Sequence, residues 1–191
     1  MIAALQISLD GYTQGEDQGE PSWVESWSDA IQLIPDVDAF VQGAGMYPGY
    51  GQYWESICDD PRRVPPFQTH APSEREIAYA QLAVKTPHLV VSTTLDGVSW
   101  PPTARIIRDL EEIRAFKAED GKNTYVVGGA TLVTSLLNAD LLDELRLIVH
   151  PILLGGGKPL FAGVTKRRAL RFVKSELTKA GRVVLTCQTR G

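Results

Sequence analysis

Short apolar runs alternate with segments of helical periodicity, and this alternation restricts the folds open to the chain. The expected strands are residues 2–9, 37–42, 87–93, 104–107, 123–127 and 145–149, and the expected helices are residues 23–34, 73–85, 109–118 and 130–138. From residue 144 onward strands follow one another, and residues 170–176 and 182–188 flank Ala180-Gly181 as a hairpin. This order indicates an α/β protein with a mixed sheet and helices on both faces. No linker or repeat interrupts the sequence, so we expect one domain over residues 1–191.

Two segments fit this pattern less well. Residues 48–72 contain glycines, prolines and aromatics with little periodicity, and we expect an irregular excursion there with a short helix at residues 53–57. Ser22 and Glu25 have the spacing of a capping box ahead of the first helix. Residues 13–20 are polar and are expected to form a loop.

Composition excludes several classes of function. The chain is 43% hydrophobic and 22% charged, as is usual for a globular domain, and its net charge of -4 provides no basic surface for nucleic acid. No apolar run approaches the roughly 20 residues of a membrane span. Cys58 and Cys187 lie far apart, which indicates neither a disulfide framework nor a zinc site. The N-terminal run MIAALQISLDGY lacks a basic region and resembles a strand more than a signal peptide, so we expect a cytoplasmic protein.

The first candidate site is the stretch YVVGGATLVTSLL, from Tyr125 to Leu137. Gly128 and Gly129 stand between an expected strand and an expected helix, where unpaired helix N–H groups and the helix dipole favour a phosphate. Glycine also lets a ligand approach the backbone closely. From spacing alone an ordinary strand-to-helix turn is slightly favoured over phosphate binding, because Gly-Gly alone is a weak motif.

Two more glycine elements follow strands. VQGAGM, from Val41 to Met46, either grips the second end of a dinucleotide or permits tight turns before the irregular segment. HPILLGGGKPLF, from His150 to Phe161, joins extended segments. Its lysine precedes a proline instead of Ser or Thr, so a bulged bend is favoured over a P-loop.

Together, SLDGY, the stretch VVGGATLVTSLLNADLLDELRLIVHPILLGGGKPLF and the terminal hairpin resemble the reductase domain of the riboflavin deaminase-reductase, the RibD C-terminal family. The resemblance covers essentially the whole chain and is strongest from Tyr125 to Phe161. It implies a dihydrofolate-reductase-like, three-layer αβα fold with a mixed, mostly parallel eight-stranded sheet. It also implies NADPH as cofactor, a small heterocyclic substrate and a homodimer.

The resemblance further implies which residues contact the ligands. The cofactor would be bound by Gly43, Ala44, Gly45, Met46, Ser92, Thr93, Gly128, Gly129, Ala130, Thr131 and Leu132. Of these, Ser92 and Thr93 match positions near the adenosine 2′-phosphate. Residues 5–7, Asp10 and Trp23 would border the nicotinamide and the substrate, and Tyr50 and Trp54, in the exposed-looking GYGQYW cluster, are candidate pocket walls.

Two departures from the family pattern bear on ligand choice. Ala44 and Met46 replace a basic residue and a threonine, and no arginine ends the VVST strand, so NADH is possible beside NADPH. The Asp-Asp-Pro element is displaced to residues 59–61, where it either touches substrate or forms a solvated turn.

Hydride transfer to a reactive imine needs mainly orientation and exclusion of water. A carboxylate beside the acceptor would stabilise positive charge or relay a proton, and Asp10 and Glu25 are the candidates, with Asp29 on the same helix as Glu25. Asp10 is also suited to a plain Asp-Gly turn, and His150 to a structural role.

The sequence therefore predicts an NAD(P)H-dependent reductase of the riboflavin-biosynthesis type, similar to 5-amino-6-(5-phosphoribosylamino)uracil reductase. Such an enzyme would transfer a hydride to an imine of a small heterocycle. A pterin or dihydrofolate reductase and a catalytically idle dinucleotide-binding protein are the alternatives.

Overall fold

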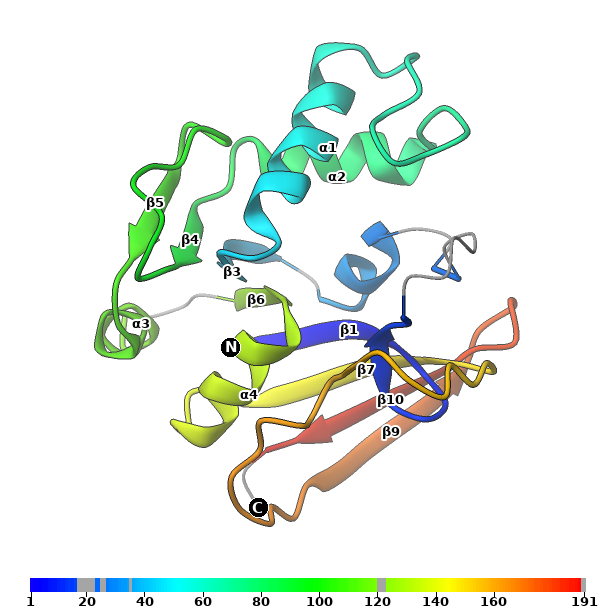
Figure 1. Ribbon diagram of the computed structural model, residues 1–191, viewed down its shortest axis with the longest axis vertical. Helices are drawn as coiled ribbons and strands as arrows, with labels where there is room; N and C mark the ends of the chain where they lie inside the picture. Colours follow the sequence, from blue (N-terminus) through cyan, green and yellow to red (C-terminus); the bar gives the residue numbers. More distant parts are fainter. Residues whose placement is uncertain (17–22, 25–26, 35, 120–122, 190–191) are drawn as a thin grey trace.

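The computed structural model describes residues 1–16, 23–24, 27–34, 36–119 and 123–189 (Figure 1). Its main sheet contains β1 (Ile2–Ser8), β3 (Val37–Gly43), β4 (His88–Val91), β5 (Ala104–Ile107), β6 (Asn123–Gly128), β7 (Glu144–His150), β9 (Arg171–Leu177) and β10 (Val183–Gln188). The strand order is β5-β4-β3-β6-β1-β7-β10-β9. The strands from β5 to β7 are parallel, whereas β10 runs antiparallel to both β7 and β9. The predicted mixed, mostly parallel eight-stranded sheet with a C-terminal hairpin is confirmed.

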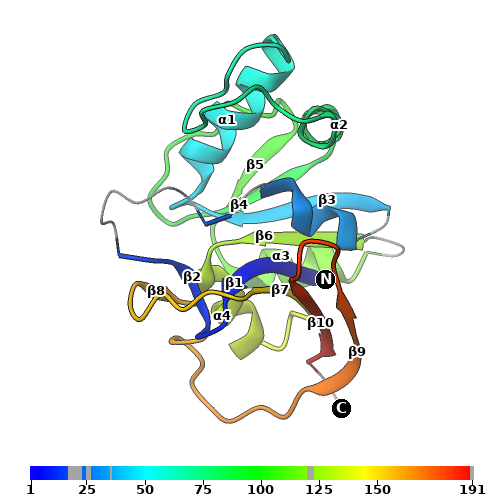
Figure 2. The same ribbon diagram turned by 90° about the vertical axis from the view of Figure 1, so that its right-hand side faces the viewer.

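Helices cover both faces of this sheet (Figures 1 and 2). The 3-10 helix η1 (Trp27–Leu33) and the helices α1 (Tyr47–Asp59) and α2 (Glu74–Ala83) lie on one face, and α3 (Leu110–Lys117) and α4 (Ala130–Asn138) lie on the other. Each face has its own apolar core, and β3 contributes to both, because Phe40 packs on the α1 side while Ala39 and Val41 pack on the α4 side. Strands buried on both faces explain the nearly continuous apolar runs in the sequence.

The helix α1 corrects the expectation for residues 48–72. Instead of a short helix at residues 53–57, a helix of 13 residues begins directly after the Gly43 turn. Pro48 stands in its first turn, where a missing N–H costs nothing. Tyr50, Tyr53 and Trp54 are at most 3% exposed, so the cluster that looked exposed from sequence is core. The buried aromatic residues of α1 do follow helical spacing, but the glycines and the proline between them made this pattern hard to recognise in the sequence.

Three smaller differences concern the other segments. The first helix is a 3-10 helix, and the expected capping box of Ser22 and Glu25 lies outside the described residues. A capping box does occur at α2, where Ser73 and Glu76 bond each other's backbone N–H groups. An unexpected two-stranded sheet joins β2 (Tyr12–Gln14) to β8 (Lys158–Pro159). No helix within the described ranges is long and apolar enough to cross a bilayer.

A buried chain of polar side chains lies between α1, α2 and β4. The ring of His88 is fully buried, with Nδ1 2.8 Å from the carbonyl oxygen of Thr86 and Nε2 2.9 Å from the hydroxyl of Tyr50. Because a carbonyl only accepts, Nδ1 carries the proton, and Nε2 accepts from Tyr50. The hydroxyl of Tyr79 then donates to that of Tyr50, at 2.9 Å. Burial lowers the pKa of His88 to about 4, so the ring is neutral at physiological pH.

Candidate functional site

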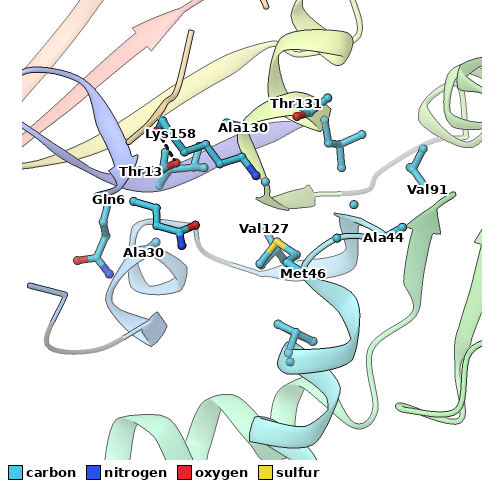
Figure 3. Close-up of a pocket in the computed structure, with 18 of the residues that line it drawn as sticks. Gln6, Thr13, Ala30, Ala44, Met46, Val91, Val127, Ala130, Thr131 and Lys158 are labelled. Atoms are coloured by element: carbon cyan, nitrogen blue, oxygen red, sulfur yellow. Dashed lines mark hydrogen bonds between the residues drawn. The ribbon is translucent and has the colours of Figure 1, made fainter. Parts of the chain in front are cut away.

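A large cavity opens across the carboxyl ends of the central parallel strands. Its volume is about 1210 Å³, above the roughly 300–1,000 Å³ typical of pockets for one small ligand. In Figure 3, Gln6 and Ala30 lie at one end, Ala44 and Val91 at the other, and Met46 and Val127 between them. This is the edge of an α/β sheet where ligands bind, and the space suffices for a long cofactor and a substrate together.

The Gly128–Gly129 turn forms the middle of the cavity wall. The peptide bond between the two glycines is cis, and Gly128 has φ of +125°, a conformation that favours glycine. A Cβ on Gly129 would meet only the Lys158 Nζ, at 3.9 Å, so the position faces open space. Gly129 is also the N-cap of α4 and provides no side-chain cap. The first N–H groups of α4 are therefore available to an anion in the cavity.

The second glycine turn lies against the first. A Cβ on Gly43 would stand 3.7 Å from both the Gly128 carbonyl oxygen and the Gly129 nitrogen, so β3 and β6 end side by side. Gly43, Ala44, Gly45 and Met46 all line the cavity and lead into α1, whose N-cap Met46 again offers no side-chain hydrogen bond. By contrast, the side chains of Ser73 and Asp109 cap α2 and α3. Two helix N-termini without side-chain caps thus converge on one space.

Lys158 brings a positive charge to the same place. It belongs to β8, and its side chain extends toward the start of α4 (Figure 3). Thr13 donates a hydrogen bond of 3.0 Å to the Lys158 carbonyl oxygen and so ties β8 to β2. The Lys158 ammonium forms no ion pair with any carboxylate in the described part of the chain. An exposed ammonium beside uncapped N–H groups is suited to a diphosphate.

The glycines around Lys158 have a structural function. Gly157 has φ of +115°, and a Cβ there would lie 2.1 Å from the Gln14 carbonyl oxygen. Only glycine therefore lets β8 approach β2 this closely. The segment is a bend that reverses the chain, and it places Leu154 and Lys158 on the cavity wall.

At the end near Gln6 the wall is aromatic. Trp23 packs edge-on against His150, with ring centroids 4.9 Å apart, and the His150 Nε2 lies 2.8 Å from the Gln6 Oε1. Tyr50, Trp54 and Tyr125 also line the cavity. The buried indole N–H of Trp54 has no hydrogen-bond partner among the described residues. A buried polar group without a partner is rare, and Trp54 itself is only 1% exposed.

The structure brings most of the predicted site residues together. Those that line the cavity are Gly43, Ala44, Gly45, Met46, Thr93, Gly129, Ala130, Thr131 and Leu132, together with Trp23, Tyr50 and Trp54. Gly128, Ser92 and Ile7 lie behind the wall. The Ser92 hydroxyl accepts from the N–H groups of Thr94 and Leu95, at 3.1 and 2.9 Å, and Ile7 belongs to the core on the α4 side.

The predicted acidic residues are placed differently. The Asp10 carboxylate accepts hydrogen bonds from the Ser8 hydroxyl at 2.6 Å and the Gly155 N–H at 2.8 Å, and it lies outside the lining residues. These two bonds hold the pKa of Asp10 below its usual value, so it is ionised at neutral pH. Asp29 pairs with Arg182 at 2.7 Å. Glu25 lies outside the described residues, and the Asp59–Asp60–Pro61 element ends α1 away from the cavity.

Sequence reasoning missed four charged residues on the wall: Glu16, Arg108, Asp109 and Lys158. Lys158 is part of the HPILLGGGKPLF motif, but its side chain comes close to Gly129 only because β8 folds back to pair with β2. Arg108 directly follows the strand 104–107. Its position on the cavity wall depends on the pairing of β5 with β4, which the sequence does not reveal. The pairing brings the Arg108 guanidinium within 3.1 Å of the Ser92 carbonyl oxygen.

The strand order, the flanking helices and the cavity define a dihydrofolate-reductase-like α/β protein. The dihydrofolate reductase of Enterococcus faecalis, solved with NADP(H) and RAB-propyl, has the same fold, with a TM-score of 0.60 and 15% identity over 100% of this chain and 97% of that one. The chain belongs to the RibD C-terminal domain family, whose model matches residues 1–184. The family resemblance stated from sequence is confirmed.

Two further proteins show how far this similarity extends. The protein YyaP of Bacillus subtilis is 30% identical over 195 residues, which cover 100% of this chain and 95% of YyaP. The Thermotoga maritima diaminohydroxyphosphoribosylaminopyrimidine deaminase/5-amino-6-(5-phosphoribosylamino)uracil reductase matches with a TM-score of 0.63 at 15% identity. That match covers 99% of this chain and 56% of the Thermotoga chain. At this level of identity the two solved structures show a common fold.

Proposed function

We propose that this protein is an NAD(P)H-dependent reductase of the riboflavin-biosynthesis type, similar to 5-amino-6-(5-phosphoribosylamino)uracil reductase. Its reaction would transfer a hydride to the imine of a small heterocyclic substrate. One observation carries the proposal: in a RibD C-terminal family member, a continuous cavity runs from the aromatic end, past the Gly129 turn, to the ends of β3 and β4. A long cofactor and a flat substrate share such a space.

The wall fits a dinucleotide diphosphate. The open space in front of Gly129 admits phosphate oxygens to the N–H groups at the start of α4, and the N-terminus of α1 reaches the same region. Lys158 adds the cation. Ala130, Thr131 and Leu132 line the path along α4, so the backbone and one ammonium would bind the diphosphate without any larger side chain intruding.

The aromatic end fits the reacting partners. A reduced nicotinamide, when bound, supplies the hydride. The apolar wall at the strand ends would keep water from the acceptor carbon; it is formed by Ala4, Leu5 and Val127. An imine that is already reactive needs orientation more than acid catalysis.

Asp10 is proposed to have a positioning role, because it holds the bend at residues 154–155 in place. Its carboxylate is ionised and bonded to Gly155 and, at 3.1 Å, to the N–H of Leu154, which itself lines the cavity. Asp10 thus holds the bend that carries Leu154 and Lys158. Glu16 lines the cavity and is the better-placed carboxylate for relaying a proton.

Binding and turnover test the proposal in sequence. Titration with NADPH and with NADH, followed by nicotinamide fluorescence, should give saturable binding of at least one. Cofactor oxidation is then measured with aminopyrimidine ribosylamines and with pterins. Turnover of the aminopyrimidines supports the riboflavin-type reductase, and turnover of pterins alone would assign the chain to pterin reduction. Binding without turnover indicates an idle binder, and binding of neither cofactor overturns the proposal.

Removing the Lys158 charge is expected to weaken the binding of NADPH and of NADH to the same extent. Lys158→Met keeps the length of the side chain and should raise the dissociation constants of NADPH and NADH roughly tenfold, because both carry the diphosphate. Isothermal titration at two salt concentrations measures the effect, which should shrink in high salt. The control is Lys166→Met, an exposed lysine outside the cavity. Equal affinities in the Lys158 variant and the wild type would exclude this contact.

A further inference from the structure

Arg108 follows β5 and lines the cavity at the end formed by Ala44, Val91 and Thr93. Two hydrogen bonds orient its guanidinium: Nη1 donates to the Ser92 carbonyl oxygen at 3.1 Å, and Nη2 donates to the Leu95 carbonyl oxygen at 2.8 Å. Carbonyl oxygens fix the plane of the group and leave its charge uncompensated. Arg108 forms no ion pair with any carboxylate in the described ranges.

The nearby carboxylates have hydrogen-bond partners of their own, although Asp109 also lines the cavity. The Asp109 side chain caps α3 by accepting from the N–H groups of Glu111 and Glu112, at 2.9 and 3.0 Å. The Glu112 carboxylate accepts from the backbone N–H of Arg108 at 2.8 Å, and Glu111 pairs with Arg114 at 3.1 Å. The positive end of the α3 dipole offsets the charges of Asp109 and Glu112. An exposed, oriented guanidinium therefore remains at the rim of the cavity.

The placement of the diphosphate proposed above decides which half of a dinucleotide would reach Arg108. With the diphosphate at Gly129 and the flat reacting rings at the aromatic end, the adenosine half extends over the ends of β3 and β4. There Ala44, Val91 and Leu110 provide apolar surface. NADPH and NADH differ only in a phosphate on this adenosine ribose. A cation at this end therefore distinguishes the two, whereas one at Gly129 does not.

We propose that Arg108 binds the 2′-phosphate of NADPH and makes the protein selective for NADPH over NADH. This inference rests on the proposed function. A guanidinium matches phosphate in a bidentate geometry, which makes arginine the strongest single partner that this end of the cavity offers. Thr93, exposed on the same wall, adds a hydroxyl donor. Arg108 thus supplies, from the neighbouring strand, the guanidinium that the VVST strand lacks.

The test compares two cofactors across four proteins: wild type, Arg108→Ala, Arg108→Lys and Arg105→Ala. Arg105 is the matched control, since it is exposed on β5, the strand directly before Arg108, and lies outside the cavity. Dissociation constants are measured by isothermal titration with NADPH and NADH, and with the fragments 2′,5′-ADP and 5′-ADP. Arg108→Ala should raise the dissociation constants of NADPH and 2′,5′-ADP roughly 10- to 100-fold and leave those of NADH and 5′-ADP unchanged. The lysine variant should be intermediate, and Arg105→Ala should match wild type.

The unchanged NADH affinity also reports that Arg108→Ala is folded. Equal binding of NADPH and NADH by the wild type, or equal weakening of both by Arg108→Ala, would overturn the inference and leave the reductase intact. Failure of the wild type to bind either cofactor is a separate outcome, because it removes the proposed function itself and this inference with it.

Discussion

Gly129→Val is expected to lower the affinity for NADPH and NADH on the order of 100-fold, with little loss of stability. The added side chain projects into the space before α4, where a Cβ meets only the Lys158 Nζ at 3.9 Å. The new methyl groups would occupy the volume of the diphosphate and cover the helix N–H groups. Because no described backbone atom is struck, the free energy of unfolding should fall by about 1 kcal/mol or less, as for the loss of a good N-cap.

Two further glycine variants serve as controls for Gly129→Val. Gly97→Val is the matched control, since a Cβ there meets no described atom within 4 Å and the position is outside the cavity. It should leave both binding and stability unchanged. Gly157→Ala gives the opposite case, because its Cβ would lie 2.1 Å from a carbonyl oxygen and should destabilise the fold. Undiminished cofactor affinity in Gly129→Val, measured by titration beside thermal unfolding, would place the diphosphate elsewhere.

The second large effect is a loss of stability in acid that depends on His88. Its folded pKa of about 4 lies below the ordinary value of 6.5 because the ring is buried. Between these two pH values His88 is therefore protonated in the unfolded chain and neutral in the folded chain. The contribution of the neutral ring is fully present above pH 6.5 and is lost as the pH falls from about 6.5 to about 4. Over that window the loss amounts to about 3 kcal/mol.

Urea unfolding of wild type and His88→Gln between pH 7.5 and pH 4 isolates this contribution, because carboxylates titrate equally in both proteins. The wild type should be the more stable at pH 7.5, where His88 bonds Tyr50 and Thr86. Its advantage should shrink by about 3 kcal/mol as the pH falls to about 4. A difference between the two proteins that stays constant with pH would contradict the lowered pKa, as would an imidazole NMR titration centred near 6.5 in the folded state.

The sequence was most informative where local patterning and final structure coincide. β5 and α4 have the expected bounds, residues 104–107 and 130–138, because period-two and helical patterns there are uninterrupted. The two glycine turns at Gly43 and Gly129 were recognised separately. Their contact follows from the parallel pairing of β3 with β6, which brings equivalent strand ends together.

The remainder depends on tertiary contacts that no local pattern encodes. The helix α1 was underestimated because Pro48 and the glycines suggest a loop, whereas packing of Tyr50 and Trp54 against the sheet stabilises a helix. The cations Arg108 and Lys158 reach the cavity from segments distant from its glycines. Asp10, a plausible acid from its position after β1, is turned toward the N–H groups of the 154–155 bend.

The small sheet of β2 and β8 gives the molecule a modular construction. Its residues Thr13, Gln14 and Lys158 border the cavity, yet it shares no strand with the eight-stranded sheet. Substitution of Gln14 is therefore expected to change what the cavity accepts without altering the hydrogen bonds of the main scaffold. The strand ends and glycine turns, by contrast, are built into that scaffold. A protein divided in this way can acquire new substrates by mutation of β2 while the strand ends, the glycine turns and Lys158 stay constant, and β2 is the natural target for engineering.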